Sequence, residues 1–354
     1  MSAHIIKIIM RNKAFLKDGL SGLIRIKNEE RFIEPCIETC IDALDEIIIV
    51  YNDCTDKTPE IVEKMCKKYP DKIKAFSYNH NILSHSLSQE DYETAINLPE
   101  DSPRLHCNQC NYALSKVNYK YAVKIDVDQL YFTDELRKWR NVCSGEYQLK
   151  WKMSFIFGWI FMMYFSSYRR LSSRIGKPCL WMLPDWVFKL FIGRYLEYAK
   201  WRLKKGTATI ALSGFNVFKD DKWFVTFDNY NPPYNGEGDT LIFRVSENTY
   251  YVRSANPLSR YVTEKFICPH KVMFAGPIWF HLHANRPIWW HKIKEIKDKR
   301  PDLFVSVSEF SSMSYKDVHK KMNKGEHTLY QRILFAFVHK MGKEKIQNHL
   351  YLLK

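Results

Sequence analysis

The first third of the chain alternates short apolar runs with longer segments in which apolar residues recur at helical spacing. The short runs are rich in β-branched residues and predict buried strands at 22–26, 46–51, 72–76 and 121–125. The helical spacing predicts helices at 28–44, 58–69 and 108–117. A polar stretch at 77–104 predicts a loop. Strands that alternate with helices predict a parallel sheet covered by helices, so we expect an α/β fold.

A different pattern begins after residue 145. The run "FIFGWIFMMYF" is apolar but shorter than the about 20 residues that span a bilayer, and the stretch up to Lys205 then interleaves aromatic residues with Lys and Arg. This pattern predicts a lobe that lies in the plane of a membrane surface. A helical hairpin buried against the rest of the protein and a transmembrane hairpin are the alternatives. From Thr207 the strand-like alternation returns, and the chain ends in a basic amphipathic tail.

The net charge of the chain is compatible with several classes of partner. Of 354 residues, 54 are Lys or Arg and 39 are acids, which leaves a formal net charge of +15. This charge suits nucleic acid, a phosphorylated ligand or a membrane surface. The nine cysteines are scattered, and only Cys107 and Cys110 have C-x-x-C spacing, so we expect neither a zinc site nor a disulfide framework. The N-terminus lacks the apolar run of a signal peptide, which predicts a reduced, cytosolic protein.

Polar side chains follow three of the predicted strands. "KNEE" comes directly after the first, "YNDCTD" closes the second, and Asp126 and Asp128 follow the fourth. The carboxyl ends of parallel strands line a crevice in which ligands bind. In extended backbone, residues at i and i+2 point to the same side, so both carboxylates can meet one divalent cation together with phosphate oxygens. A lone D-x-D is more often a solvated turn, but three polar strand ends together favour a site.

These strand ends resemble a known family. The segments "LIRIKNEERF", "IIIVYNDCTDKTPEIV" with the following "CKKYP", and "AVKIDVDQLYF" are similar to the nucleotide-sugar half of GT-A glycosyltransferases of the large inverting family that includes cellulose and chitin synthases. They resemble most closely the bacterial β-1,4-N-acetylgalactosaminyltransferases that extend lipooligosaccharide outer cores. The resemblance covers roughly the first third of the chain.

The resemblance implies a Rossmann-like GT-A nucleotide-diphospho-sugar transferase fold, into which the aromatic and basic membrane-associating lobe is inserted. We therefore expect four parts of the chain. They are a nucleotide-sugar-binding half at 1–145, the apolar and basic insertion at 146–206, an acceptor-binding and catalytic half at 207–300, and a basic helical tail at 301–354.

The resemblance also implies which residues bind the donor. The residues expected to line the uridine and diphosphate pocket are Arg25, Lys27, Asn28 and Glu29. Asn52 and Asp53 are expected to contact the uracil or the ribose, whereas Asp56 holds its turn through backbone hydrogen bonds. Asn108 and Asn111 fall where the family runs a helix beneath the diphosphate, although a solvated helix face explains them about as well.

A second set of residues is implied for the metal and the chemistry. Asp128 is expected to bind Mn²⁺ or Mg²⁺ and Asp126 the same metal or the ribose, with His281 or His283 as a further ligand and His281 preferred. Arg286 is expected to stabilise the departing UDP.

An inverting transfer also needs a base that deprotonates the acceptor hydroxyl. The family places this base in an acidic pair downstream of D-x-D, and "YNGEGDTLIF" offers Glu237 and Asp239. We expect Asp239 to be the base and Glu237 to be the alternative base or an acceptor-binding group. Acids that cap a helix explain both positions about equally well.

The function implied is a metal-dependent inverting glycosyltransferase. We expect it to transfer a hexose or N-acetylhexosamine, with N-acetylgalactosamine preferred, from a UDP-sugar to a lipooligosaccharide, a capsule or another cell-surface glycan. We expect it to be peripheral on the inner face of the bacterial cytoplasmic membrane, bound to an anionic surface. The alternative is a basic membrane- or nucleic-acid-binding protein on a catalytically inactive transferase-like fold. Clustered carboxylates and the lack of nucleic-acid motifs argue against nucleic acid.

Overall fold

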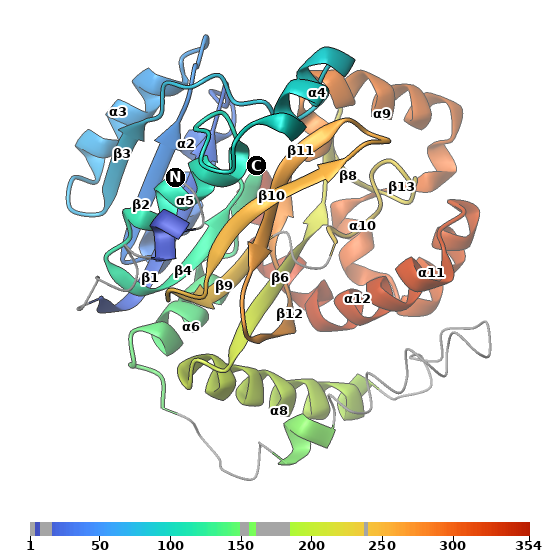
Figure 1. The fold of residues 1–354 in the computed structure, drawn as a ribbon. Helices are drawn as coiled ribbons and strands as arrows, with labels where there is room; N and C mark the ends of the chain where they lie inside the picture. The colour runs from blue at the N-terminus through green and yellow to red at the C-terminus, as the bar shows by residue number, and fades with distance from the viewer. Residues whose placement is uncertain (1–3, 8–15, 149–155, 161–184, 237–239) are drawn as a thin grey trace.

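An eight-stranded mixed sheet lies at the centre of the protein, in the order β3-β2-β1-β4-β9-β6-β12-β5 (Figure 1). The structure is a computed structural model that describes residues 4–7, 16–148, 156–160, 185–236 and 240–354. The strands of this sheet are β1 (Lys17–Ile26), β2 (Glu46–Tyr51), β3 (Ile73–Ser77), β4 (Tyr119–Ile125), β5 (Gln129–Tyr131), β6 (Ala208–Asn216), β9 (Thr240–Arg244) and β12 (Lys271–His281). The first four in spatial order, β3-β2-β1-β4, are parallel. This arrangement confirms the parallel sheet predicted for the N-terminal part.

The parallel strands are apolar because both of their faces are buried. In β2, Ile47 and Ile49 pack into the core on one face of the sheet, whereas Ile48 and Val50 pack into the core on the other. Polar side chains are therefore left to the strand ends, which is where the candidate site forms.

Helices cover both faces of the sheet. One face carries α2 (Ile33–Cys40), η1 (Ile41–Ala43), α3 (Thr58–Lys68) and α6 (Thr133–Cys143). The other face carries α4 (Gln89–Asn97), α5 (His106–Ser115) and the antiparallel hairpin of β10 (Tyr250–Asn256) and β11 (Tyr261–Ile267). The hairpin crosses in front of the sheet (Figure 1), beside α5.

The loop predicted at 77–104 is wrong for the residues of α4. Ser88 caps this helix by accepting a hydrogen bond from the Asp91 backbone N–H at 3.0 Å. Only Tyr92 and Ala95 of the helix are buried, so its apolar face is too narrow to produce a clear period in the sequence.

The second half of the sheet is mixed. β9 pairs antiparallel with both β4 and β6, β12 is parallel to β6, and β5 pairs antiparallel with β12 at the far edge. After β12 the chain forms η3 (His283–Asn285), α9 (Pro287–Lys299) and η4 (Pro301–Leu303). A small sheet joins β7 (Phe218–Lys219), β8 (Trp223–Thr226) and β13 (Phe304–Ser306).

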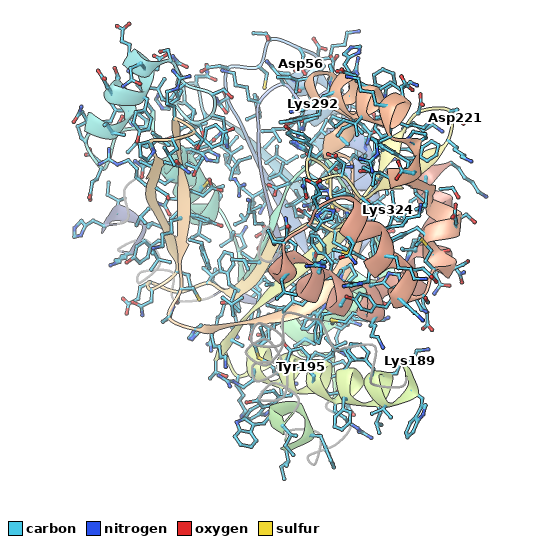
Figure 2. All side chains as sticks on the ribbon, turned by 90° about the vertical axis from the view of Figure 1, so that its right-hand side faces the viewer. Asp56, Lys189, Tyr195, Asp221, Lys292 and Lys324 are labelled. Carbon is cyan, nitrogen blue, oxygen red and sulfur yellow. The ribbon has the colours of Figure 1, made fainter. Side chains whose placement is uncertain are left out.

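The C-terminal residues pack against this second half. They form α10 (Val307–Ser312), α11 (Tyr315–Lys324), α12 (Leu329–His349) and η5 (Leu350–Leu353), and Figure 2 shows them on one side of the molecule. Helix α12 packs on β12 and buries Phe335, Phe337 and Ile346. The Lys345 ammonium lies 2.7 Å from a carboxylate oxygen of Glu135, which ties α12 to α6. The basic helical tail is therefore part of the core.

Part of the predicted insertion at 146–206 is helical. Residues 156–160 form a helical segment, and α8 (Asp185–Lys204) lies beneath the sheet (Figure 1). Phe188, Ala199 and Leu203 of α8 are buried. Among the residues that the structure describes, no helix is both long and apolar enough to span a bilayer.

Candidate active site

Two strand-end loops are joined by hydrogen bonds at the carboxyl edge of the parallel sheet. Asn28, which follows β1 with a φ of 56°, accepts from the Thr55 backbone N–H at 2.7 Å. Asp56 accepts from the Glu30 and Thr58 backbone N–H groups at 3.1 and 3.0 Å, as expected from the sequence. "KNEE" and "YNDCTD" are therefore one connected rim rather than two independent turns.

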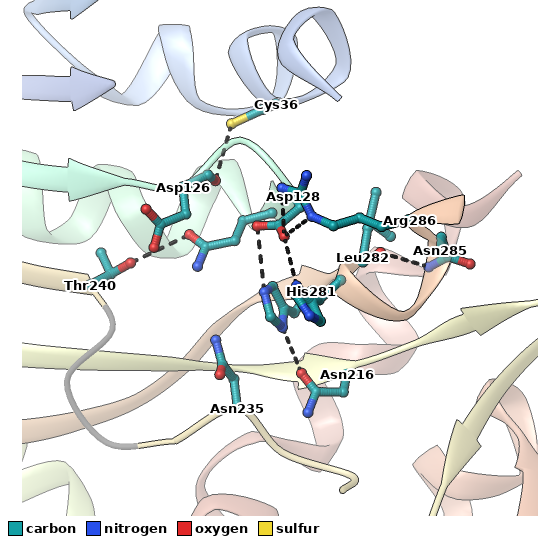
Figure 3. Close-up of polar contacts among 12 residues, drawn as sticks. Cys36, Asp126, Asp128, Asn216, Asn235, Thr240, His281, Leu282, Asn285 and Arg286 are labelled. Carbon is teal, nitrogen blue, oxygen red and sulfur yellow. Dashed lines mark hydrogen bonds and ion pairs between the residues drawn. The ribbon is translucent and has the colours of Figure 1, made fainter. Parts of the chain in front are cut away.

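A cluster of three side chains that could hold a metal ion lies next to this rim. One oxygen or nitrogen from each of Asp128, His281 and His283 lies within 4.8 Å of the other two (Figure 3). Asp128 lies in the turn between β4 and β5, whereas His281 ends β12. The pairing of β5 with β12 sets His281 opposite Gln129, and so brings the histidine beside Asp128.

The donor set suits a divalent metal. One carboxylate oxygen and two imidazole nitrogens are ligands that divalent first-row transition metals accept. The His281 Nδ1 lies 2.8 Å from the Asn216 side-chain oxygen, and its Nε2 lies 3.5 Å from an oxygen of Asp128. If Nδ1 donates to Asn216, Nε2 would offer its lone pair to a metal once it has released its proton to make room for that metal. Asn216 would thereby hold the imidazole in the tautomer that a metal needs. The structure thus brings together three of the four residues named from the sequence as candidate metal ligands.

Arg286 neutralises the carboxylates around the cluster. Its Nε and Nη2 each donate to the same oxygen of Asp128 at 3.1 Å, and its Nη1 donates to Glu29 at 3.0 Å. Burial raises the pKa of the Asp128 carboxyl, but the hydrogen bonds and charges of His281, His283 and Arg286 outweigh it and hold this pKa well below its usual range. Asp128 is therefore ionised at neutral pH, as a metal ligand must be.

Asp126 faces a different set of groups from Asp128. Its two carboxylate oxygens lie 3.5 Å from Arg25 Nη2 and 3.4 Å from Lys124 Nζ. The two aspartates lie in and beside a turn rather than in extended backbone, and Figure 3 shows their carboxylates pointing apart. Asp126 thus belongs to an ion-pair network with Arg25 and Lys124 and not to the cluster of Asp128, His281 and His283.

A cleft of about 710 Å³ opens beside Asp126. The expected donor residues that line it are Arg25, Lys27, Glu29, Asn52 and Asp126. Two buried groups in it have polar atoms without a hydrogen-bond partner in the described part of the chain: Nε and Nη1 of Arg25, and Nδ2 of Asn52. A buried hydrogen-bond donor without an acceptor costs free energy, and a ligand that accepts from it removes this cost. The cleft thus offers a guanidinium and an amide donor to an oxygen-rich ligand.

Four residues that sequence reasoning missed also line the cleft: Lys124, His106, Gln109 and Glu264. Gln109 donates to the Asn52 side-chain oxygen at 2.8 Å, which orients the Asn52 amide. Glu264, on β11, lies 2.8 Å from His106 Nδ1 and 3.6 Å from Lys124 Nζ. The hairpin β10–β11 thereby closes the cleft through an ion-pair network.

His106, Cys110 and Glu264 are also close enough to one another to hold an ion. The neighbouring Lys124 ammonium already pairs with Glu264, and Arg25 lies in the same cleft. Burial lowers the pKa of His106, but electrostatic attraction to Cys110 and Glu264 outweighs it and raises this pKa to about 10. The His106 imidazole is therefore a cation at neutral pH, which favours an ion pair over a metal site.

Replacing His106 with glutamine is expected to destabilise the protein in a pH-dependent way. Removing one partner of a buried ion pair costs roughly 3–5 kcal/mol. Because the pKa rises from 6.5 to about 10 on folding, the contribution of His106 to stability is complete below pH 6.5 and is lost as the pH rises through 10. The difference in free energy of unfolding between wild type and variant, measured by urea unfolding, should therefore shrink over that range.

The control for this experiment is His80→Gln, which changes an exposed histidine. It should leave the free energy of unfolding nearly unchanged at every pH. A His106→Gln difference that stays constant from pH 6.5 to 10 would show that the imidazole is not held as a cation in the folded protein.

The remaining expected residues lie outside the cleft or outside the described residues. Asn108 donates to the Glu100 and Ser102 backbone oxygens at 2.7 and 2.8 Å, and Asn111 exchanges hydrogen bonds with the Tyr251 backbone. Both are buried and hold neighbouring segments on α5, and neither lines the cleft. Asp53 is exposed in its loop with a φ of 40°. Glu237 and Asp239 lie outside the described residues.

Residues 17–167 match the profile of a family described as beta-1,4-N-acetylgalactosaminyltransferase (CgtA). No curated protein matches the chain.

Solved structures are similar over part of the chain. Glucosyl-3-phosphoglycerate synthase from Mycobacterium tuberculosis, in complex with Mn²⁺, UDP and phosphoglyceric acid, is similar over 35% of this chain and 37% of that chain, with 19% identity and a TM-score of 0.21. S. aureus TarS is similar over 87% of this chain and 43% of that chain, with 11% identity and a TM-score of 0.31. The chain thus spans less than half the length of these solved chains.

The family match covers the parallel strands, the strand-end rim and both aspartates of the β4–β5 turn. Residues 17–167, less than half of the chain, thus match the β-1,4-N-acetylgalactosaminyltransferase (CgtA) family.

Proposed function

We propose that this chain is a metal-dependent, inverting glycosyltransferase that uses a UDP-sugar. The observation that carries this proposal is the connection between the metal-binding cluster and the basic cleft. Asp126 lines the cleft, and so does Glu29, which shares the Arg286 guanidinium with Asp128. Glu29 thus links the two, and we propose that a diphosphate bound in the cleft would extend toward the cluster.

The chain's own residues would bind and orient the donor. Arg25 and Lys124 would neutralise phosphate charge from the floor of the cleft, and Lys27 would do so from its rim. The Asn52 amide, held by Gln109, supplies a hydrogen-bond donor for a carbonyl of the uracil base. A divalent ion held by Asp128, His281 and His283 would supply charge stabilisation for the leaving UDP. Arg286 would add a second positive charge at the same place.

The transfer itself needs a base on the acceptor side. We propose Asp239 for this role, with Glu237 as the alternative base or as a group that binds the acceptor. A carboxylate would accept the proton of the acceptor hydroxyl as the hydroxyl oxygen attacks the anomeric carbon. Because the attack comes from the face opposite UDP, which departs, the configuration at that carbon is inverted.

The donor and the acceptor are proposed from the family related to residues 17–167. We propose N-acetylgalactosamine as the transferred sugar, within the wider class of hexoses and N-acetylhexosamines. The proposed acceptor is a lipooligosaccharide, a capsule or another cell-surface glycan. Such an acceptor would place the enzyme as a peripheral protein on the inner face of a bacterial cytoplasmic membrane.

A thermal-shift panel tests this function directly. The panel compares UDP-N-acetylgalactosamine, UDP-galactose and UDP-glucose, each with and without Mn²⁺, and uses GDP and CDP as controls for the base. A ligand at about 100 times its Kd stabilises the folded state by about 2.7 kcal/mol, so the preferred donor should raise the Tm clearly, and only with Mn²⁺. Equal shifts for all nucleotides, or none for UDP-sugars with Mn²⁺, would contradict the proposed function.

A further inference from the structure

A second large cavity lies far in sequence from the donor cleft, between α8, α11 and α12. Its volume is about 700 Å³. The charged residues that line it are Lys189, Lys316, Lys320, Lys340, Lys343 and Glu344. It shares no lining residue with the donor cleft. Figure 2 labels Lys189 at one end of α8, below the C-terminal helices.

Lysines outnumber acids among the described residues that line this cavity. Glu344 is the one acid among the described lining residues, and it pairs with Lys189 at 2.5 Å. Four further lysines, on α11 and α12, surround the same space. Like charges gathered around one cavity repel one another, and an anion bound among them relieves that repulsion.

The walls of the cavity are partly apolar. Phe188 and Tyr315 are buried and line it, and the Lys340 ammonium lies 5.4 Å from the centre of the Phe188 ring. The cavity is therefore suited to an anionic group that carries apolar atoms, rather than to a fully hydrated ion alone.

Exposed apolar side chains lie on both helical segments of the insertion. On α8, which contributes Phe188 and Lys189 to the cavity, Trp186 is 71% exposed and Leu190 is 54% exposed. The helical segment 156–160 adds Ile156, Phe157, Trp159 and Ile160, all exposed.

A close contact holds this segment against α8. A Cβ atom at Gly158 would lie 2.3 Å from the Tyr198 Cβ. The two helices therefore expose their large apolar side chains from one packed unit. Large side chains exposed together in this way mark an interaction surface.

We propose that the cavity between α8, α11 and α12 binds the phosphate headgroup of an anionic phospholipid while Trp186, Leu190 and the exposed residues of 156–160 enter the lipid surface. The lysines supply charge complementarity to the headgroup, and the apolar residues beside them suit the boundary between headgroups and acyl chains. This inference does not rest on the proposed transferase function, because it involves none of the donor-cleft residues.

Vesicle sedimentation tests the basic part of this site. The full chain should bind vesicles of an equimolar mixture of phosphatidylcholine and phosphatidylglycerol, and bind vesicles of phosphatidylcholine alone much more weakly. Each lysine near an anionic surface contributes about 1 kcal/mol, so the double variant K316A/K320A should bind the mixed vesicles roughly 30-fold more weakly.

The matched control is K67A/K299A, which removes two exposed lysines from α3 and α9. Urea unfolding of each variant establishes that it is folded. If both double variants weaken binding equally, the net charge of the protein and not this cavity attracts the membrane, and the proposal is wrong.

A third variant distinguishes binding to a lipid surface from binding of free phosphate. W186S should weaken binding to the mixed vesicles while leaving any binding of inorganic phosphate, measured by calorimetry, as in wild type. Unchanged vesicle binding by W186S, or binding of phosphate or a nucleic-acid duplex without binding of vesicles, would overturn the proposal.

Discussion

Replacing Asp128 with asparagine is expected to abolish Mn²⁺-dependent binding of UDP and to lower sugar transfer by roughly 10²–10³-fold, the range seen when a charge-stabilising group is lost. Asparagine keeps the shape of the side chain but removes the charge that Arg286, His281 and His283 now surround. Three positively polarised groups would then face one another, so a divalent cation would bind poorly. Calorimetry with UDP, with and without Mn²⁺, measures the effect on binding.

The matched control for this experiment is Asp221→Asn, which makes the same change at a carboxylate 70% exposed and paired with Lys297 (Figure 2). It should leave UDP binding and transfer as in wild type. Circular dichroism of both variants shows whether the fold is kept. If Asp128→Asn binds UDP with an unchanged dependence on Mn²⁺, the metal site lies elsewhere.

Replacing Asp239 with asparagine is expected to spare donor binding but to reduce kcat by roughly 10²–10⁴-fold, the contribution attributed to a general base. The reason is that an amide cannot accept the proton of the acceptor hydroxyl, while the groups that hold the donor are unchanged. This is the opposite pattern to Asp128→Asn, in which metal-dependent donor binding itself is lost. Steady-state transfer assays together with UDP calorimetry separate the two.

Glu237→Gln is the comparison for Asp239→Asn. If Glu237 binds the acceptor, its variant should raise the KM for the acceptor with a smaller loss of kcat. Near-normal turnover of Asp239→Asn with a large loss of kcat in Glu237→Gln would transfer the role of base to Glu237.

The fold of the N-terminal part was predictable because its signals are local. The strands from β1 to β4 are continuous apolar runs, and the helices on one face have clear stripes, so each element follows from a few neighbouring residues. The position of Asp126 and Asp128 at a strand end followed in the same way. Even Lys124, which interrupts the run of β4, is a local signal, since it lies two residues before Asp126 and pairs with it.

The rest of the site was not predictable because it depends on contacts between distant segments. His106 and Glu264 meet only when the β10–β11 hairpin folds over α5. The two asparagines of α5 resemble donor ligands in sequence, but the helix turns them toward the backbone of Tyr251 and of the loop before α5. Nothing in the spacing of these residues indicates which face of α5 meets the cleft.

The pairing of β5 with β12 has a consequence for how the protein is made. Asp128 belongs to the early part of the chain, whereas Arg286 follows it by 158 positions and His281 lies at the end of β12. Long-range pairings of this kind form late, because the loop between them must close first. A growing chain on the ribosome therefore carries the carboxylate long before the imidazoles. The cluster of Asp128, His281 and His283 can be complete only after synthesis has passed β12 and this strand has paired with β5.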